Sequence, residues 1–308
     1  MPSVDSDSLE AQLPDPRNAD IWVHVGGRLV PRSEAKVSVF DSSVQGGDAV
    51  WEGLRVYDGR IFMLDAHLDR LVASARAMAF AEIPEVATIK QAIFDTLEKN
   101  GMRDGAHIRL TLTRGEKVTS GMSPTFNRFG PCLIVLAEWK APVYDAAGIR
   151  LITSSVRRNA PQCLDSKIHH NNLINNILAK IEANVARVDD ALMLDINGFV
   201  AETNATNVFL IRRSELHTPT ADSCVPGITR KVVLELADQL EIPKFVRNIT
   251  PAEVYAVDEM FTTGTMGELA PVLEVDGRPL GSEPGPVTRR LQEAYAQRVA
   301  AEGEPLPF

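Results

Sequence analysis

A lysine stands just ahead of a strongly helical run in the second half of the chain. The stretch QCLDSKIHHNNLINNILAK, residues 162–180, places Lys167 beside two histidines and two asparagines. A lysine in such a place can be a solvated residue before a helix, an anchor for a phosphate group or a nucleophile. The stretch alone leaves these three roles open, and solvent exposure is the commonest of them.

Glu202 and Arg70 are further candidates whose plainest interpretation is structural. Glu202 lies in GFVAETNATNVF, at the end of one strand of an expected hairpin, and small polar residues follow where a core strand should resume. A carboxylate at a sheet edge explains this pattern without any function. Arg70 lies in HLDRL, on the polar side of a predicted helix, where most arginines are solvated.

Two loops have the composition of a phosphate site. In VPGITRK, Gly227 allows a close turn, and the amides of Ile228 and Thr229 fall in the first turn of a predicted helix, whose dipole favours an anion. In TTGT, hydroxyls and amides form a similar cradle that ends at Thr265. Each loop is explained equally well as a plain turn, but two in one half of the chain strengthen each other.

The histidine pair does not predict a metal site. His169 and His170 are adjacent, so their side chains point to different sides, whereas a helical metal pair needs a spacing of about four residues. The sequence also contains no GxSxG, HExxH, P-loop or GxGxxG motif. It therefore gives no support to serine hydrolases, zinc peptidases, nucleotide hydrolases or dinucleotide-binding enzymes.

Strands and helices that could position these residues alternate along the chain. Alternating apolar residues predict a hairpin over 21–40 through Gly26 and Gly27, and a second one over 50–64 through Asp58 and Gly59. Asp65 is expected to cap the helix that follows. Further helices are predicted over 88–99, over 171–188 and after Gly227, and further strands over 107–115, 131–139, 149–158, 191–211 and 259–272.

The domain organisation follows from these elements. We expect a disordered arm over 1–20, a small α+β domain over 21–138, a linker over 139–147 and a second domain over 148–308. The net charge of −9 opposes tight binding to nucleic acid or anionic lipid, and no apolar run approaches a membrane span. Three cysteines without CxxC spacing favour reduced thiols, and the N-terminal residues favour a cytoplasmic protein.

Seven segments together resemble a known family. They are VSVFD, GGDAVWEGLRVYDGRIFMLDAHLDRL, HIRLTLTRG, DSKIHHNN, GFVAETNATNVF, VPGITR and TTGTMGELAPV. In this order they resemble the class IV, or fold-type IV, pyridoxal-phosphate enzymes, which include branched-chain and D-amino-acid aminotransferases and aminodeoxychorismate lyases. The resemblance implies an α+β protein of two domains, with a small α/β domain and a larger C-terminal domain with a β-barrel-like core. It also implies a homodimer, in which a loop such as TSGMSP reaches the partner subunit.

The resemblance implies a role for each matched residue. Lys167 matches the lysine that bonds covalently to pyridoxal phosphate (PLP) and then moves the substrate's Cα proton, and Glu202 matches the carboxylate that faces the pyridine nitrogen. Asn172 stands where branched-chain enzymes often carry a tyrosine near the cofactor's phenolic oxygen. The phosphate would be held by Arg70, by Gly227, by the amides of Ile228 and Thr229, and by Thr265.

The substrate side of the resemblance favours branched-chain aminotransferases. Arg109 in HIR is kept from their usual tyrosine-x-arginine pattern, although His107 replaces the tyrosine. Trp51 resembles the aromatic wall of an apolar side-chain pocket, with Thr265 and Met266 as further substrate contacts. The TRG sequence that ends at Gly115 is not followed by the arginine and histidine, two residues apart, that hold the substrate carboxylate in D-amino-acid aminotransferases.

The function that the resemblance implies is transamination. The leading hypothesis is a PLP-dependent transfer of an amino group from a branched-chain or other apolar L-amino acid to a 2-oxo acid such as 2-oxoglutarate. A D-amino-acid or (R)-amine transaminase of the same fold, and a lyase like aminodeoxychorismate lyase, are the alternatives. A non-catalytic binding protein is disfavoured, because binding alone needs neither Lys167 nor Glu202.

Overall fold

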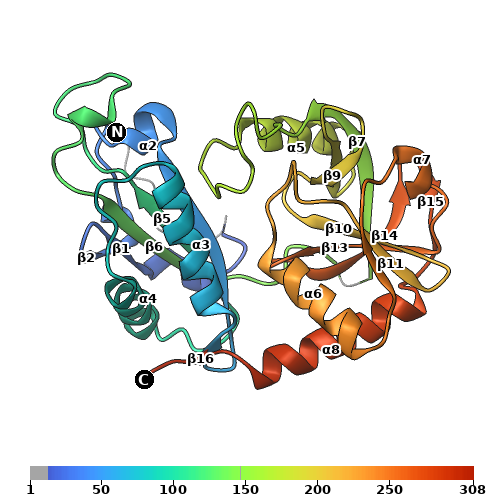
Figure 1. Cartoon of the computed structure of the whole chain (residues 1–308). Coiled ribbons are helices and arrows are strands. Elements are labelled where there is room, and N and C mark those ends of the chain that lie inside the picture. Colours follow the sequence, from blue (N-terminus) through green and yellow to red (C-terminus); the bar gives the residue numbers. More distant parts are fainter. Residues whose placement is uncertain (1–12, 146) are drawn as a thin grey trace. The chain divides into compact units, whose positions relative to one another are not determined.

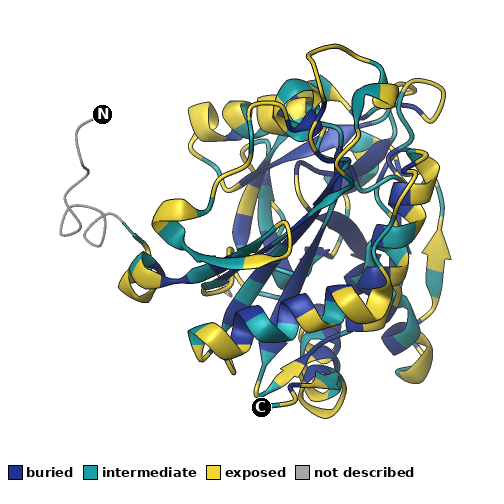
Figure 2. Ribbon diagram, turned by 90° about the vertical axis from the view of Figure 1, so that its left-hand side faces the viewer, coloured by how far each residue is buried: buried dark blue, intermediate teal, exposed yellow. Residues whose placement is uncertain are grey.

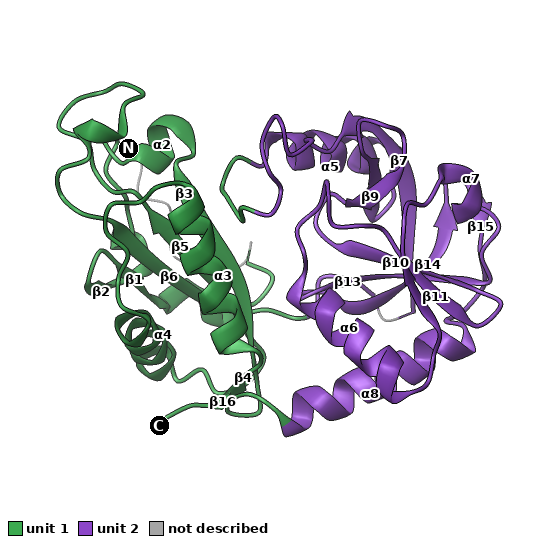
Figure 3. Cartoon of the chain, viewed as in Figure 1, with its two compact units in different colours: residues 1–141, 168–172, 302–308 green, residues 142–167, 173–301 purple. Residues whose placement is uncertain are grey.

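The computed structural model describes residues 13–145 and 147–308, which form two compact units (Figure 3). Unit 1 contains the described residues up to Ala141 together with the segments 168–172 and 302–308, and unit 2 contains the rest. The boundary after Ala141 falls inside the expected linker, whereas both short segments were expected in the second domain. The chain therefore leaves unit 2 directly after Lys167 and returns to it at Leu173.

Unit 1 is built on a seven-stranded sheet in the order β16-β4-β3-β5-β6-β1-β2, in which all neighbours are antiparallel. Both predicted hairpins are confirmed, because β1 pairs with β2 and β3 pairs with β4. The strands are β1 Trp22–Val25, β2 Arg28–Pro31, β3 Ala49–Tyr57, β4 Arg60–Ile61, β5 Ala106–Thr113, β6 Cys132–Trp139 and β16 Glu304–Pro305.

Two long helices pack on the sheet of unit 1, α3 (Leu64–Ala77) and α4 (Val86–Asn100) (Figure 1). Their apolar faces join the strands in one core, which appears as buried segments in Figure 2. The expected cap at Asp65 is wrong, because α3 begins at Leu64 and the Asp65 carboxylate pairs with Lys90 at 2.8 Å. A short helix, α2 (Ser42–Gly46), and the 3-10 helices Arg32–Glu34 and Pro124–Phe126 complete the unit.

The N-terminal arm is partly structured, in contrast to the expectation of disorder over 1–20. Pro16–Asp20 form a 3-10 helix, and Asn18 is buried. The Asn18 amide donates to the Trp139 carbonyl and its oxygen accepts from the Trp139 N–H, both at 2.9 Å. This pairing fixes a segment, PRNAD, that has no large apolar side chain of its own. Residues 1–12 of the predicted arm lie outside the described residues.

Unit 2 contains a nine-stranded mixed sheet that curls into a half-barrel (Figure 1). Its main path runs β12-β11-β10-β13-β14-β7-β8-β9, and β15 pairs with β14. The predicted class of fold, with a barrel-like core in the larger part, is confirmed. The strands are β7 Ile149–Arg157, β8 Asp190–Leu194, β9 Val200–Thr203, β10 Asn207–Arg212, β11 Glu215–Thr218, β12 Lys244–Val246, β13 Glu259–Gly264, β14 Glu268–Val275 and β15 Arg278–Pro279.

The helices of unit 2 are α5 (Ile174–Ala186), α6 (Ile228–Gln239), α7 (Pro251–Val254) and α8 (Pro286–Ala301). α5 packs on β7 and β8 through Ala179 and Ala183, small residues that let the helix approach Ala191 and Met193 closely. Within 13–145 and 147–308, no helix has both the length and the apolar character needed to span a bilayer. The same residues contain no group of three His, Cys, Asp or Glu side chains suited to a metal ion.

Candidate active site

Lys167 lies on a loop of unit 2 rather than at the mouth of a helix. The predicted helix begins only at Ile174, so six residues separate it from Lys167 (173 − 167). The Lys167 N–H donates to the Asp165 carboxylate at 3.0 Å, and its Nζ lies 3.8 Å from the same carboxylate. The side chain is 49% exposed. Its amine is therefore accessible to a small molecule.

Glu202 lies in β9, the last strand of the main sheet path, and its side chain is nevertheless buried. Its Oε1 lies 2.9 Å from Nε of Arg158, and its Oε2 accepts from the Asn207 amide at 3.2 Å. Burial raises the pKa of Glu202 to about 7, against the opposing effect of the Arg158 charge. A carboxyl group in this state can exchange a proton with a ligand near neutral pH.

Arg158 is a functional candidate that the sequence did not reveal. The side chain is buried, and besides Glu202 it donates to Asn176 at 2.8 Å and to Ser166 at 3.1 Å. It therefore links the buried carboxylate to the residue that precedes Lys167. In the sequence Arg157 and Arg158 are adjacent at a strand end, and nothing there distinguishes the buried arginine from its neighbour.

Cys224 shows that these groups lie within electrostatic reach of one another. Burial raises the pKa of its thiol, and the negative charge of Glu202 adds to the rise. The positive charges of Arg230, Arg158 and Lys167 oppose it. Lys167, Glu202 and Arg158 thus surround one region of unit 2.

The ion pair gives a first testable prediction. Arg158→Met leaves Glu202 buried without its cation, so we expect unfolding free energy to fall by about 3–5 kcal/mol. Adding Glu202→Gln removes the unpaired charge, so the double variant should be more stable than Arg158→Met alone. Urea unfolding of both variants measures the difference. A double variant that is less stable than Arg158→Met would contradict a charge-based pairing.

The turn before α6 is shaped for close approach of a ligand. Gly227 is the N-cap residue, and no side chain caps the helix. A Cβ at Gly227 would lie 2.1 Å from the Asn207 side-chain oxygen, so no other residue fits without a shift. The amides of Ile228 and Thr229 lie in the first turn and have no acceptor within the helix. An anion such as a phosphate satisfies such amides and gains from the helix dipole.

The second predicted loop follows β13, which pairs with β10, the strand whose Asn207 contacts the Gly227 turn. Thr263 pairs directly with Asn207 across β13 and β10, which places both side chains on one face of the sheet. Its hydroxyl is buried and has no hydrogen-bond partner among the described residues. Thr265 and Met266 follow in the loop to β14, where the Met266 carbonyl accepts from the Val143 N–H at 3.1 Å. Unit 2 thus brings together both loops that the sequence suggested for phosphate.

Arg70 lies in unit 1, where its guanidinium is held by a buried carboxylate. Nε and Nη2 donate to the two Glu52 oxygens at 2.8 and 2.7 Å, and the Glu52 side chain is fully buried. The interpretation of Arg70 as a solvated surface charge is therefore wrong. A guanidinium is a planar group that suits carboxylates and phosphates alike, and here it binds Glu52 through two donors. A phosphate contact by Arg70 stays a prediction.

The candidate substrate residues of unit 1 also form one group. The Arg109 guanidinium lies 3.4 Å from the Trp51 ring centroid and donates to Asn171 at 3.1 Å. Burial lowers the pKa of Arg109 to about 10, so it remains charged at neutral pH. Burial, with the charges of Lys140, Arg109 and Arg55, lowers the pKa of His107 to about 3, so this imidazole is neutral. Arg109 is the cation of this group, and His107 adds no charge.

Asn172 is fixed within unit 1 by the turn that follows α2. Its amide donates to the Gly47 carbonyl at 3.1 Å. Gly47 has φ 65°, and a Cβ there would lie 2.9 Å from the Asn172 side-chain oxygen. The turn therefore requires glycine for both its conformation and this contact. A cofactor contact by Asn172 stays a prediction.

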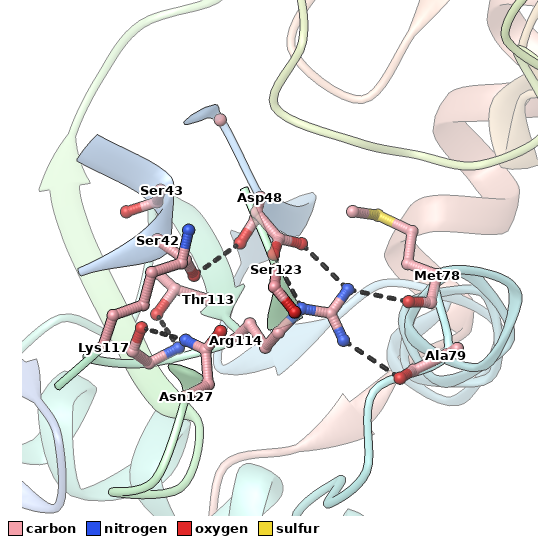
Figure 4. A network of polar contacts seen from close by, with 12 residues as sticks. Ser42, Ser43, Asp48, Met78, Ala79, Thr113, Arg114, Lys117, Ser123 and Asn127 are labelled. Atoms are coloured by element: carbon pink, nitrogen blue, oxygen red, sulfur yellow. Dashed lines mark hydrogen bonds and ion pairs between the residues drawn. The ribbon is translucent and has the colours of Figure 1, made fainter. Parts of the chain in front are cut away.

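Arg114, the arginine of TRG, is occupied by structural contacts (Figure 4). Its Nε and Nη2 donate to Asp48 at 2.7 and 3.0 Å. Nη2 and Nη1 also donate to the carbonyls of Met78 and Ala79, at 2.7 and 3.0 Å. The guanidinium joins the residues that follow α3 to Asp48, the residue before β3.

Known proteins show a consistent similarity to this chain. A family model described as amino-transferase class IV matches residues 49–275. The branched-chain-amino-acid aminotransferase-like protein 2 of Arabidopsis thaliana is 60% identical to this chain. The match covers 96% of this chain and 53% of the plant protein. The branched-chain-amino-acid aminotransferase of Pseudomonas aeruginosa is 35% identical and is matched over 95% of its length, with 94% of this chain covered.

A solved structure extends the similarity to three dimensions. The branched-chain aminotransferase of the thermophilic archaeon Thermoproteus uzoniensis, solved with norvaline, superposes with a TM-score of 0.85 at 31% identity. The match covers 92% of this chain and 95% of that one. The chain thus spans about half the length of the first plant relative and nearly all of the bacterial and archaeal enzymes.

Proposed function

The chain belongs to the class IV aminotransferase family, and from this premise we propose that it is a PLP-dependent transaminase of branched-chain or other apolar L-amino acids, with a 2-oxo acid such as 2-oxoglutarate as acceptor. The observation that carries the proposal is the pair of Lys167 and Glu202 in unit 2. An accessible amine and a buried, arginine-paired carboxylate are the two groups that this chemistry requires. When bound, PLP supplies an aldehyde that bonds to amines and a ring that accepts electrons.

Each residue of unit 2 then has a defined task. Lys167 gives its amine for covalent attachment and, once released, moves a proton at the substrate Cα. Glu202 holds a proton at the pyridine nitrogen, and Arg158 keeps the carboxylate in place and favours its charged form. The first-turn amides of α6, with Thr229 and Thr265, bind the phosphate. Two observations support a phosphate at this place: no side chain caps the start of α6, and the buried Thr263 hydroxyl has no hydrogen-bond partner within the part of the chain that the structure describes.

The choice of an L-amino acid rests on unit 1. Arg109 is a buried, charged guanidinium beside an indole ring, which suits a substrate carboxylate next to an apolar side chain. The residues after the TRG sequence lack the arginine and histidine, two apart, that hold the substrate carboxylate in D-amino-acid aminotransferases, and Arg114 itself binds Asp48 and two carbonyls. These contacts favour the branched-chain activity over the D-amino-acid, (R)-amine and lyase alternatives.

A panel of donors tests this function. The protein, reconstituted with PLP, is mixed with L-valine, L-leucine, L-isoleucine, their D-enantiomers or 1-phenylethylamine, each with pyruvate or 2-oxoglutarate. We expect the L-amino acids to change the visible spectrum and 2-oxoglutarate to restore it. Turnover only with D-amino acids or amines would show that these, and not L-amino acids, are the substrates. A spectrum unchanged by every donor would refute the proposal that the protein is a transaminase.

A homodimer in the cytoplasm is the assembly that we propose. The stripe of α5 formed by Ile174, Ile177, Leu178, Ile181 and Val185 is apolar, and its side chains are 45–80% exposed. Their spacing of three and four residues places them on one helix face, opposite the buried Ala179 and Ala183. The loop expected to reach the partner subunit carries Met122, which is 89% exposed. A second copy that covers these residues removes apolar surface from water.

Charges on the α5 stripe test this assembly. The variant with Ile177→Asp and Ile181→Asp is expected to sediment as a monomer, because two carboxylates cannot be buried in an apolar interface without partners. Val246→Asp places a charge on an exposed apolar residue of β12 and should leave the dimer intact. A dimer that survives the double substitution would exclude α5 from the interface.

A further inference from the structure

The chain beyond Lys167 is bound to unit 1 as an extra strand-like segment. On one side of β3, the neighbouring strand β4 pairs with Val56 and Tyr57 at the end of β3 and does not reach its start. The segment 168–172 occupies this edge: the Trp51 N–H donates to the His169 carbonyl and the Asn171 N–H donates to the Ala49 carbonyl, both at 2.9 Å. A bridge between Val50 and His170 lies between these bonds. The main chain next to Lys167 is thereby held in one register.

His169 adds side-chain contacts to this backbone pairing. Its Nδ1 lies 3.0 Å from Oε1 of Glu52, and its ring packs on Trp51 with centroids 4.1 Å apart. Its backbone N–H donates to the Ser74 hydroxyl at 3.1 Å. His169 is thus held to unit 1 by its side chain as well as by its backbone, in a segment that begins one residue after Lys167. Its position, two residues beyond the candidate nucleophile, links these contacts to the reactive loop.

Glu52 connects His169 to the candidate phosphate-binding arginine. The carboxylate is fully buried, and Arg70, which is always charged, pairs with it at 2.7 Å. Although burial acts in the opposite direction, His169, Arg70 and His67 hold the pKa of Glu52 well below its usual range. An ionised carboxylate only accepts hydrogen bonds, so both histidines donate from Nδ1. Burial lowers the pKa of His169 itself, with Glu52 opposing.

We propose that His169 is a positioning residue, which fixes the main chain beside Lys167 through its hydrogen bond to Glu52 and so determines how tightly PLP is bound. The inference rests on the proposed function. Lys167 is followed by six residues before the next helix, so the chain around it loses conformational freedom when a ligand bonds to the lysine. A chain that is already held in place loses less, and the ligand then binds more tightly. A hydrogen bond to a charged group corresponds to roughly 10- to 100-fold in an equilibrium constant.

The two histidines on Glu52 offer a matched test. His67 and His169 each donate one Nδ1–H to Glu52, at 2.7 and 3.0 Å, but only His169 continues into Lys167. The dissociation constant of PLP is measured by equilibrium dialysis for the full-length protein, His169→Leu, His67→Leu and His169→Asn. We expect His169→Leu to bind PLP about tenfold or more weakly. His67→Leu and His169→Asn, whose amide still reaches Glu52 as a donor, should stay within about threefold of the unsubstituted protein.

Equal weakening by His67→Leu and His169→Leu would overturn the proposal, because the effect would then come from Glu52 and Arg70. An unchanged affinity in His169→Leu would overturn it too. Ser74→Ala provides a milder variant that keeps the core volume: loss of the hydroxyl that accepts the His169 N–H should weaken PLP binding several-fold, and an unchanged affinity counts against the proposal. If borohydride trapping finds no PLP on Lys167 of the unsubstituted protein, the proposed function fails. If trapping finds PLP on Lys167, the proposed function stands and the variants test the role of His169 alone.

Discussion

Lys167→Ala is expected to lower transamination by at least about 10³-fold, because the variant loses both the covalent attachment and the group that moves the Cα proton. Lys167→Arg should be equally inactive, although it keeps the positive charge, since a guanidinium does not form the bond to the aldehyde. The measurement is the steady-state rate with L-leucine and 2-oxoglutarate, together with peptide mapping after borohydride reduction. The label should reside on residues 162–180 of the unsubstituted protein and disappear in both variants.

A surface lysine of the same unit provides the control for this substitution. Lys231 on α6 has a side chain that is 69% exposed, and its pairing with Glu235 at 4.0 Å is weak. Lys231→Ala should therefore keep the rate and the label. Because Lys167 is exposed and its ion pair with Asp165 is long, at 3.8 Å, its removal should leave the thermal midpoint of unfolding nearly unchanged. Substantial turnover in Lys167→Ala would contradict the assignment of the nucleophile.

The sequence predicted the elements well wherever the signal is local. Gly26-Gly27 and Asp58-Gly59 each stand between alternating apolar residues, and both hairpins form at these turns. The predicted helix over 88–99 is confirmed as α4, because its apolar spacing fits one buried face. Asp65 failed as a cap because the N-cap is Met63, a residue with positive φ, so the helix starts two residues earlier than the polar pattern suggests. Helix ends depend on backbone conformation that side-chain type only weakly determines.

The electrostatic partners of the site were beyond the reach of the sequence pattern. Glu202 looks like an edge carboxylate because its cation, Arg158, directly follows β7 and its amide partner, Asn207, comes from β10. Glu52 stands in a strand whose alternation reveals burial but not the arginine and two histidines that converge on it from α3 and the segment 168–172. Such contacts join segments far apart in the chain, and no local periodicity encodes them. The family resemblance supplied the roles of Lys167 and Glu202, and the structure supplied their partners.

Glu202→Gln should lower kcat by about 10²–10³-fold while PLP remains attached to Lys167, because removing one preorganised electrostatic group typically costs this much. A neutral amide cannot hold a proton at the pyridine nitrogen, so the electrons left by the departing Cα proton are poorly accepted. The visible spectrum should show a full complement of cofactor, and stopped-flow mixing with L-leucine should show slow loss of its band. A rate within about tenfold of the unsubstituted protein would contradict this role.

A second substitution, at Arg158, distinguishes this electrostatic effect on the rate from damage to the fold. Glu202→Gln leaves the buried Arg158 with neutral partners, namely Asn176, Ser166 and the Ser223 carbonyl, and this change on its own destabilises unit 2. The double variant Glu202→Gln with Arg158→Met removes that charge, so it should recover stability without recovering kcat. If the rate returned together with the stability, the loss in Glu202→Gln would reflect a distorted site. A rate that stays low in a stable protein assigns the loss to the missing carboxylate beside the ring nitrogen.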